Sequence, residues 1–150
     1  MGVTGRRILL PALALLVVSL AGELVHASNV LRASRIVRAV ALTTGALPRD
    51  ASAQPALRHN LALAIEAVRL DPDSLAAAQA LGSIYLLLNR PADATDAYRR
   101  ALALQPAAEI YMDLGHAALA AGDTAQARQR YARALELDTR LAVQIPVAAR

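Results

Sequence analysis

Few side chains in this sequence could carry out chemistry, and they are widely separated. The three histidines, His26, His59 and His116, form no His-x-x-x-His pair, and the chain has no cysteine. A structural or catalytic zinc ion needs several such ligands at short, defined spacings. We therefore expect no metal site. His116 falls on the inner face of an expected helix, where we expect it to line a binding surface and not to act as a ligand or a base.

A short acidic segment, residues 71–74 (DPDS), resembles the start of a calcium-binding loop. The glycine at the sixth position and the closing glutamate of such a loop are missing. We expect Asp73 or Ser74 to cap the next helix instead. Asp96 has Arg100 four residues later, a spacing that favours an ion pair along a helix.

The composition excludes several classes of enzyme. The chain has 36 Ala and 26 Leu, all 16 of its basic residues are Arg, and Lys, Cys, Phe and Trp are absent. Without Lys there is no P-loop and no Schiff base, and without Cys there is no thiol nucleophile and no disulfide framework. There is no Gly-x-Ser-x-Gly elbow either. We expect no catalytic residues and no cofactor.

The positive charge belongs to the N-terminal half. Residues 1–70 carry a net charge of +5 and residues 71–150 a net charge of −1. Nucleic-acid binding would need a basic surface, often with aromatic side chains for base stacking. No aromatic residue lies beside the N-terminal arginines, so we expect no nucleic-acid partner.

An apolar segment near the N-terminus predicts contact with a membrane. Arg6 and Arg7 precede residues 8–22 (ILLPALALLVVSLAG), which are apolar on all sides. Fifteen helical residues span about 22 Å, less than the ~30 Å hydrocarbon core, and extension to Val25 or Leu31 makes the helix long enough. We expect residues 8–25 to enter the membrane.

Two interpretations of this segment remain open. In the first, residues 1–27 are a retained signal anchor, a single-pass helix in an inner (cytoplasmic) membrane. In the second, Val25-His26-Ala27 is a cleavage site before Ser28, and the mature chain is a secreted, soluble periplasmic adaptor. We favour the anchor. The arginine counts on the two sides are equal and leave the orientation open, but the short N-terminal tail favours export of the C-terminal part to the periplasm.

Residues 28–54 predict a basic amphipathic helix followed by a loop. Between Asn29 and Thr44, one arc at 100° per residue is apolar, and the opposite arc carries three arginines. We expect Ser28 or Asn29 to be the N-cap and Gly45 to follow the helix. The apolar arc contains Val30, Ala33, Ile36, Val37 and Val40, and the basic arc contains Arg32, Arg35 and Arg38. Either the arginines face lipid headgroups at the membrane surface, or the apolar arc packs on the next helix and the arginines are solvated.

The remaining chain contains an internal repeat. A shift of 33 residues places Leu81-Gly82 on Leu114-Gly115, and Tyr98 on Tyr131. A period of this length is typical of solenoids. Glycine inside a helix costs about 1 kcal/mol relative to alanine, so these glycines predict a close approach by a neighbouring helix, with each tyrosine filling the gap between successive helix pairs.

These residues resemble the tetratricopeptide repeat (TPR) family. One unit begins at Leu75 and a second near Ala108, each with the Leu-Gly pair, the tyrosine and the small alanines of the family pattern. Residues 57–72 (LRHNLALAIEAVRLDP) resemble the second helix of a degenerate first unit. The resemblance implies an all-α fold: a short TPR-type helix-turn-helix solenoid of about two and a half repeats, residues 55–140, behind an N-terminal hydrophobic helix.

The resemblance also implies a binding surface, since the first helix of each unit lines the concave face of such a solenoid. The predicted partner-binding residues are Gln79, Ser83, Leu86, Leu87, Glu109, Met112, His116 and Leu119. Relatives that bind the acidic tails of heat-shock chaperones place Lys, Arg and Asn on this face, and none is found here. The apolar floor favours a partner helix or an apolar peptide. Alternatively, Leu86 and Leu87 pack on the degenerate first unit and cover half of the groove.

The end of the solenoid predicts a further contact. Residues 141–150 form a C-terminal tail that reaches Pro146 within two turns, too short for a capping helix. We expect an incompletely covered end carrying Leu135, Val143 and Ile145, which another polypeptide would cover, either a membrane-complex subunit or a second copy of the chain. These features predict a membrane-anchored scaffold or assembly subunit, with a secreted adaptor or a lipid-binding surface module as alternatives.

Overall fold

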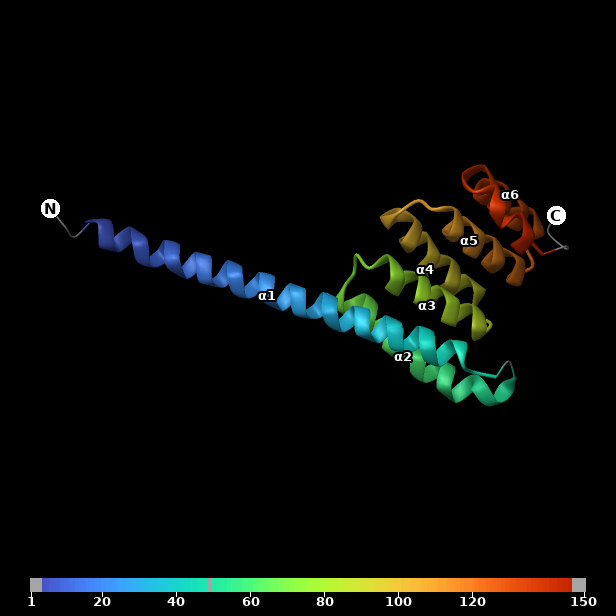
Figure 1. The fold of residues 1–150 in the computed structure, drawn as a ribbon, viewed down its shortest axis with the longest axis horizontal. Coiled ribbons are helices and arrows are strands. Elements are labelled where there is room, and N and C mark those ends of the chain that lie inside the picture. Colours follow the sequence, from blue (N-terminus) through green and yellow to red (C-terminus); the bar gives the residue numbers. More distant parts are fainter. Residues whose placement is uncertain (1–3, 49, 147–150) are drawn as a thin grey trace.

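The computed structural model describes residues 4–48 and 50–146, with side chains from Leu15 onward, and every regular element in these ranges is helical (Figure 1). The predicted all-α solenoid is confirmed. The side chains of Arg6 and Arg7 lie outside the described residues. The elements are α1 (Thr4–Gly45), η1 (Ala51–Ala53), α2 (Gln54–Leu70), α3 (Leu75–Leu87), α4 (Pro91–Leu104), α5 (Ala108–Ala120), α6 (Thr124–Leu137) and η2 (Thr139–Gln144).

Helix α1 is one unbroken helix of 42 residues, and this corrects the prediction of a helix start at Ser28 or Asn29. The Ser28 hydroxyl does not cap a helix but donates a hydrogen bond to the Val25 carbonyl at 2.9 Å. Gly45 is the last helical residue and does not lie beyond the helix. The continuous helix is favoured because a break would leave four N–H and four C=O groups without partners, and the local residues are mostly good helix formers.

The second half of α1 packs on α2 and α3 through the predicted apolar arc. Ala33 and Val40 are fully buried, and Ile36 and Val37 are partly buried. Their buried neighbours on α2 and α3 are Ala64, Ala67, Leu70, Ala77 and Ile84, with partly buried leucine and valine side chains packed around them. Of the two interpretations of this amphipathic segment, packing on the next helix is therefore observed.

A buried amide fixes the end of α1 against α2. Asn60 of α2 is 3% exposed, and its Nδ2 group donates hydrogen bonds to the hydroxyls of Thr43, at 3.0 Å, and Thr44, at 2.9 Å. A buried amide without partners would cost about 1–3 kcal/mol. This pairing holds one register between the two helices.

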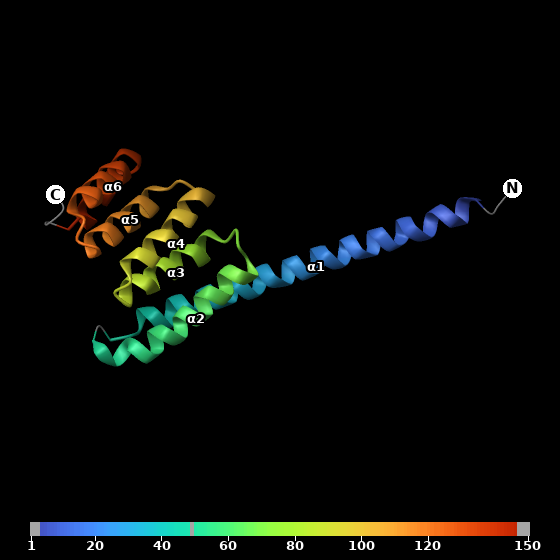
Figure 2. The ribbon, with the colours of Figure 1, turned by 180° about the vertical axis from the view of Figure 1, so that it is seen from behind.

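Three helix pairs stack in sequence: α1 with α2, α3 with α4, and α5 with α6 (Figures 1 and 2). Each helix packs on the next one along the chain, and α3 also contacts both α1 and α5. The helices α1, α3 and α5 therefore form one layer, and α2, α4 and α6 form the other. The N-terminal half of α1 projects away from both layers, as the two views show.

The turns between helices follow the predicted chemistry. Asn89 and Gly122 have positive φ values of 57° and 83° and end α3 and α5, a conformation that glycine and asparagine adopt most readily. The Ser74 hydroxyl accepts a hydrogen bond from Ala77 N, and the Asp123 carboxylate accepts one from Gln126 N. The sequence left open whether Asp73 or Ser74 caps α3, and the structure shows that Ser74 does.

One predicted ion pair is replaced by other contacts. Asp96 lies 3.6 Å from Arg99 and not beside Arg100. Arg100 instead donates a hydrogen bond to the Pro72 carbonyl at 2.9 Å. An ion pair with either arginine would add little stability, because the Asp96 carboxylate is exposed. The Pro72 carbonyl, which lies in the turn between units, gains a hydrogen-bond donor from Arg100.

The two tyrosines occupy equivalent positions in successive pairs. Tyr98 is buried against Gly82, and Tyr131 is buried against Gly115. The predicted reason for glycine at these helical positions is confirmed, since a Cβ atom at either would overlap the ring. The small buried side chains Ala94, Ala101, Ala127 and Ala134 complete the two contacts.

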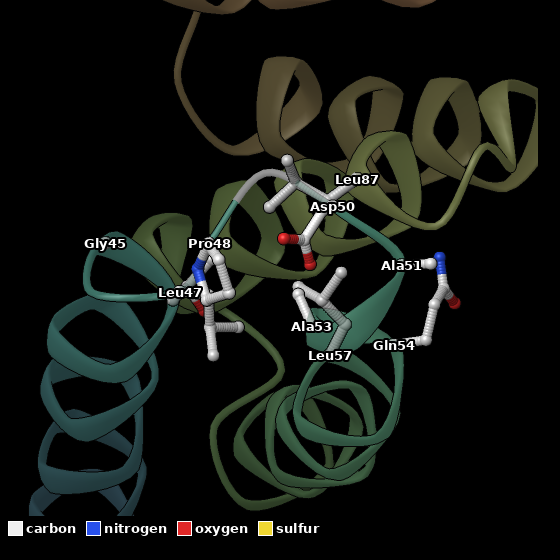
Figure 3. Close-up of a pocket in the computed structure, with 10 residues that line it drawn as sticks. Gly45, Leu47, Pro48, Asp50, Ala51, Ala53, Gln54, Leu57 and Leu87 are labelled. Atoms are coloured by element: carbon white, nitrogen blue, oxygen red, sulfur yellow. The ribbon is translucent and has the colours of Figure 1, made fainter.

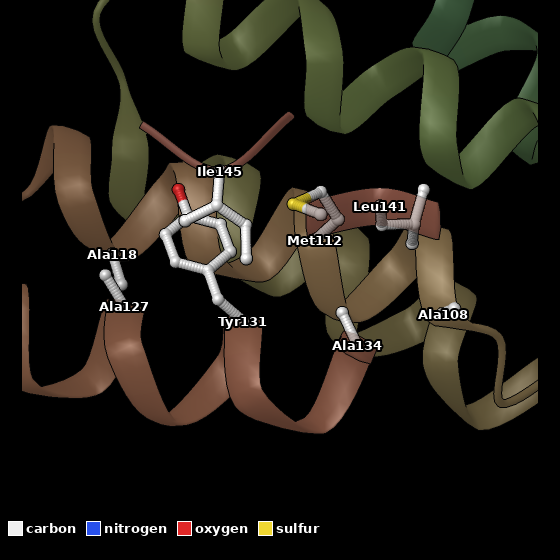
Figure 4. Close-up of a cluster of buried hydrophobic side chains, with 8 residues drawn as sticks. All are labelled: Ala108, Met112, Ala118, Ala127, Tyr131, Ala134, Leu141 and Ile145. Atoms are coloured by element: carbon white, nitrogen blue, oxygen red, sulfur yellow. The ribbon is translucent and has the colours of Figure 1, made fainter. Parts of the chain in front are cut away.

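The C-terminal segment covers the last pair, which corrects the prediction of an uncovered end. Leu141 in η2 and Ile145 after it are buried against Tyr131 and Met112 (Figure 4). Leu135 packs partly against the same cluster, and Val143 alone of the three named residues is largely exposed, at 86%. The tail reaches back far enough because η2 begins directly after α6.

This segment replaces the first helix of a further unit. Ile110 and Leu114 of α5, four residues apart, pack on the cluster around Tyr98. Leu141 and Ile145, also four residues apart, pack on the equivalent cluster around Tyr131. No second polypeptide is needed to bury this face, so the structural reason for expecting a second copy here is removed.

Candidate protein-binding surface

The predicted binding residues lie on α3 and α5, adjacent helices of one layer that contact each other. Seven of the eight have side chains that are partly or well exposed and could meet a partner without rearrangement: Gln79, Ser83, Leu86, Leu87, Glu109, His116 and Leu119. The structure separates this set into a polar part at the α3–α5 contact and an apolar part near the end of α3.

The polar part begins at Ser83. Its hydroxyl donates to the Gln79 carbonyl at 3.0 Å and lies 3.2 Å from the hydroxyl of Tyr98. Burial and the nearby Asp113 carboxylate raise the pKa of Tyr98 above its ordinary value. The phenol therefore stays protonated and can hydrogen bond with Ser83 at the surface formed by α3 and α5.

Asp113 of α5 is a residue of this surface that sequence reasoning missed. It is partly buried, and the Gln79 side chain of α3 donates a hydrogen bond to it. Burial, with a further contribution from nearby Glu109, raises the pKa of Asp113 to about 6. One feature of the sequence could have indicated Asp113. It is charged, whereas the equivalent position of the preceding unit, α3 with α4, is Ala80.

The other predicted residues of α5 are more covered than expected. Met112 is only 3% exposed because Leu141 and Ile145 pack over it, so Met112 belongs to the core and not to the open surface. Leu119 also packs partly against this cluster. Near Tyr131, the half-buried His116 ring meets the phenol ring edge-on, with centroids 5.5 Å apart, and burial lowers the pKa of His116.

The apolar part of the surface lies where α3 approaches the α1–α2 loop. Leu86 is partly buried and packs against the cluster around Tyr98, whereas Leu87 is 52% exposed. Leu87 lines a hollow of about 650 Å³ together with the loop residues Leu47, Pro48 and Asp50 (Figure 3). The alternative in which Leu86 and Leu87 both pack on the degenerate first unit and cover half of the groove is therefore not observed. Leu87 remains open to a partner.

The three arginines of the basic arc do not share one environment. Arg32, Arg35 and Arg38 are all exposed. The charge of Arg32 contributes to lowering the pKa of Glu66 in α2, after the larger effect of the Arg69 hydrogen bond. Arg35 and Arg38 instead line a shallow hollow on the outer face of α1, next to Leu31 and Leu42.

Among the residues that the structure describes, no three His, Cys, Asp or Glu side chains come close enough to hold a metal ion. His59 is exposed on α2 and His116 is half-buried beside Tyr131. The expectation of a non-catalytic chain stays a prediction.

Two matches to the tetratricopeptide repeat model fall on the units seen in the structure, at residues 75–107 and 108–140. These two units are tetratricopeptide repeats. Each TPR is one helix pair of the solenoid, α3 with α4 and α5 with α6. TPR domains bind protein partners or peptides.

Solved structures show the same architecture. TTC0263, a TPR protein of Thermus thermophilus, is 30% identical with a TM-score of 0.60, and the alignment covers 70% of this chain and 55% of that one. MamA is 22% identical with a TM-score of 0.54, over 56% of this chain and 49% of its own. The chain thus spans about half of either protein. No curated protein matches the chain.

The first TPR domain of RPAP3, solved with the HSP90 peptide SRMEEVD, is 19% identical with a TM-score of 0.64 and covers 80% of this chain and 86% of that one. This likeness shows the fold alone. Because the alignment is longer than the two matched repeats, it includes part of the chain before Leu75. The α1–α2 pair therefore shares the arrangement of the repeats, in agreement with the predicted degenerate first unit.

Proposed function

We propose that the chain is a membrane-anchored scaffold, which holds a partner protein in its TPR groove beside a bacterial-type inner membrane. Residues 8–25 of α1 cross the bilayer once, and the repeats lie on the periplasmic side. One observation carries the proposal: all residues from Leu15 to Ser28 are exposed, with the large apolar side chains up to Val25 between 60% and 72%. Burial of apolar surface is worth about 25 cal/mol per Å², so this surface favours transfer into lipid.

The dimensions of α1 support the anchor. Leu15–Gly45 is long and apolar enough to cross a membrane: an 18-residue stretch within it has a mean hydropathy of 1.3, and none of that stretch is buried against the repeats. Residues 8–25 extend over about 27 Å, close to the ~30 Å hydrocarbon core. Ala33, the first buried residue from Leu15 onward, follows Val25 by eight positions, about 12 Å along the helix, so the repeats begin directly beside the headgroups.

The chemistry of the groove indicates the kind of partner. The RPAP3 domain binds the acidic HSP90 peptide, whereas the groove of this chain has the carboxylates of Asp113 and Glu109 and no Lys or Arg at the predicted positions. An acidic tail would meet repulsion there. An apolar helix or peptide, with its apolar side chains on Leu87 and its polar groups beside Ser83 and Gln79, suits the groove better.

The second candidate is a secreted periplasmic adaptor that binds peptides after cleavage behind Ala27. A specific observation favours keeping it: the described side chains from Leu15 to Ser28 are all exposed and partial burial begins at Asn29, so cleavage would leave the packed part of α1 whole. The same apolar helix near an N-terminus is also what a signal sequence has.

Two measurements on the native protein decide between these functions. The anchored scaffold predicts an intact mass that includes residues 1–27 and retention in the membrane pellet after extraction with alkaline carbonate. The adaptor predicts a mature chain that begins at Ser28 and is released into the soluble fraction. A full-length chain that carbonate releases completely would contradict both, and would leave the repeats as a binding module without an anchor.

A further inference from the structure

The packed half of α1 carries a stripe of two leucines and two arginines on its outer side. At 100° per residue, Leu31, Arg35, Arg38 and Leu42 point away from the buried arc by about 180°. Leu31 is 61% exposed and Leu42 70%. The four residues line a hollow of about 420 Å³ that none of α2 to α6 enters. We call these four residues the outer stripe.

The outer stripe lies in line with apolar side chains of the membrane segment. Val17, Leu20 and Leu24 precede Leu31 on the same side of the helix at intervals of three, four and seven residues. Such spacing places side chains along one line and is used by helices that pack lengthwise on another helix. The stripe therefore runs from the lipid-exposed part of α1 into the part that belongs to the solenoid.

Among the described residues, the charges on the stripe have no counterpart. Within residues 15–48 and 50–146 no ion pair involves Arg35 or Arg38, whereas Arg32 lies on the side of α2, where its charge acts on Glu66. Two arginines between two exposed leucines would complement a surface with the same apolar spacing and negative charges.

We propose that the outer stripe docks an acidic amphipathic helix of a partner membrane protein. Aliphatic side chains of that helix pack on Leu31 and Leu42, and its Asp or Glu side chains pair with Arg35 and Arg38. This inference rests on the proposed anchor, since it assumes that the partner runs beside α1 out of the bilayer. It adds a second contact surface to the groove formed by α3 and α5.

Two other occupants fit less well. Leu42 follows Val25 by 17 residues, about 26 Å along the helix, so a spanning α1 carries it well beyond the headgroups, where lipid cannot reach it. A second copy packed in parallel through the same stripe would place Arg35 and Arg38 opposite their own equivalents, because a two-fold interface brings each residue close to its copy. Like charges at that distance oppose such a dimer.

Site-specific photocrosslinking in native membranes tests the proposal with the full chain. p-Benzoylphenylalanine replaces Leu42 in one variant and Ile65, an exposed residue of α2 away from the stripe, in the control. We expect an adduct in the variant at position Leu42 and none in the variant at Ile65. Mass spectrometry should map the adduct to a partner helix that carries Asp or Glu. The adduct should disappear in the Arg35→Glu/Arg38→Glu background and persist with Arg32→Gln. An adduct with lipid only, with a second copy, with a segment that lacks acidic residues, or no adduct at all would overturn the proposal.

A defined probe gives an independent readout. The full chain in phosphatidylcholine nanodiscs is titrated with a synthetic 21-residue helix that has Leu at heptad positions and Glu beside them, and with the same peptide carrying Lys in place of Glu. We expect the Glu peptide to bind at least fivefold more tightly, a preference lost with Arg35→Gln/Arg38→Gln and kept with Arg32→Gln. Equal binding of the two peptides would overturn the proposal. Carbonate extraction reports on the anchor alone, so a failure of the stripe is distinguished from a failure of the membrane segment.

Discussion

The ring of Tyr98 occupies the space that a side chain at position 82 would need: a Cβ atom on Gly82 would lie 2.5 Å from Cε1 of Tyr98. Gly115 and Tyr131 repeat this relationship one unit later. The contact brings the two helices of each pair together at the point where the next unit stacks. The repeat of 33 residues is therefore a repeat of one glycine–tyrosine contact.

The first prediction concerns this contact. Gly82→Ala should destabilise the full chain, because overpacking against a ring that is 1% exposed costs about 1–3 kcal/mol, offset in part by the ~1 kcal/mol gain in helix propensity. Gly45→Ala is the matched control, since nothing lies within 4 Å of its Cβ. Urea unfolding in mild detergent measures both. Equal stability of the two variants would show that the glycine is not required by the tyrosine.

The second prediction compares the two phenols. The Tyr98 hydroxyl lies 3.2 Å from Ser83 Oγ, whereas the Tyr131 hydroxyl is buried with no hydrogen-bond partner among the described residues. Tyr98→Phe should lower the free energy of unfolding by about 1 kcal/mol. Tyr131→Phe should leave it unchanged or raise it, because it removes an unpaired buried group. Thermal unfolding of the two variants checks the difference, and a larger loss for Tyr131→Phe would contradict it.

The third prediction concerns the covered end of the solenoid. Leu141→Ala and Ile145→Ala should each lower the stability by about 2–4 kcal/mol, as expected for truncation of a buried aliphatic side chain, and Val143→Ala, at an 86% exposed site, should have almost no effect. Sedimentation in detergent should show the wild-type chain as a monomer, because its own tail and not a partner buries this face. A stability equal to wild type for Ile145→Ala would mean that the tail does not cover Tyr131.

The fourth prediction is a pH dependence set by Asp113. Its pKa is raised to about 6 in the folded chain by burial and, to a smaller extent, by Glu109, against about 3.9 for a free Asp side chain. The folded state therefore binds the proton more tightly, and this stabilisation is present below pH 4 and is lost as the pH rises through about 6.

Asp113→Asn should consequently match the wild type at pH 4 and exceed it in melting temperature at pH 8. Glu136→Gln is a control, because its exposed carboxylate pairs with Arg133 at the surface of α6. If the difference between Asp113→Asn and wild type is the same at pH 4 and pH 8, the carboxylate does not have the raised pKa that its position implies.

The elements that were predicted correctly are those whose residues act through short-range rules. Tyr98 and Tyr131 occupy equivalent positions because a fixed period places the same residue types in the same contact. Gly122 and Ser74 end and begin helices for reasons of backbone geometry that the sequence shows directly. The apolar arc around Ala33 packs on α2 because no other face of that segment is apolar enough.

The features that were missed depend on contacts between distant residues. Ser28 has the type of an N-cap, but it is helical because its hydroxyl can be satisfied by the Val25 carbonyl inside the helix. Met112 was placed in the groove by its offset within the unit, and only the path of the chain after α6 shows that Ile145 covers it. Asp113 falls in the groove through its contact with Gln79 of another unit, which no local pattern contains.

Helix α1 is one continuous helix whose C-terminal half forms the first helix of the solenoid, and we propose that its N-terminal half enters the bilayer. Since the chain has no cysteine, single cysteines at Leu20 and Leu42 can each carry a fluorophore in the full chain reconstituted into vesicles with brominated lipids. The account predicts strong quenching at Leu20 and none at Leu42. Absence of quenching at both positions would contradict the anchor, and strong quenching at both would contradict a helix that leaves the bilayer to join the repeats.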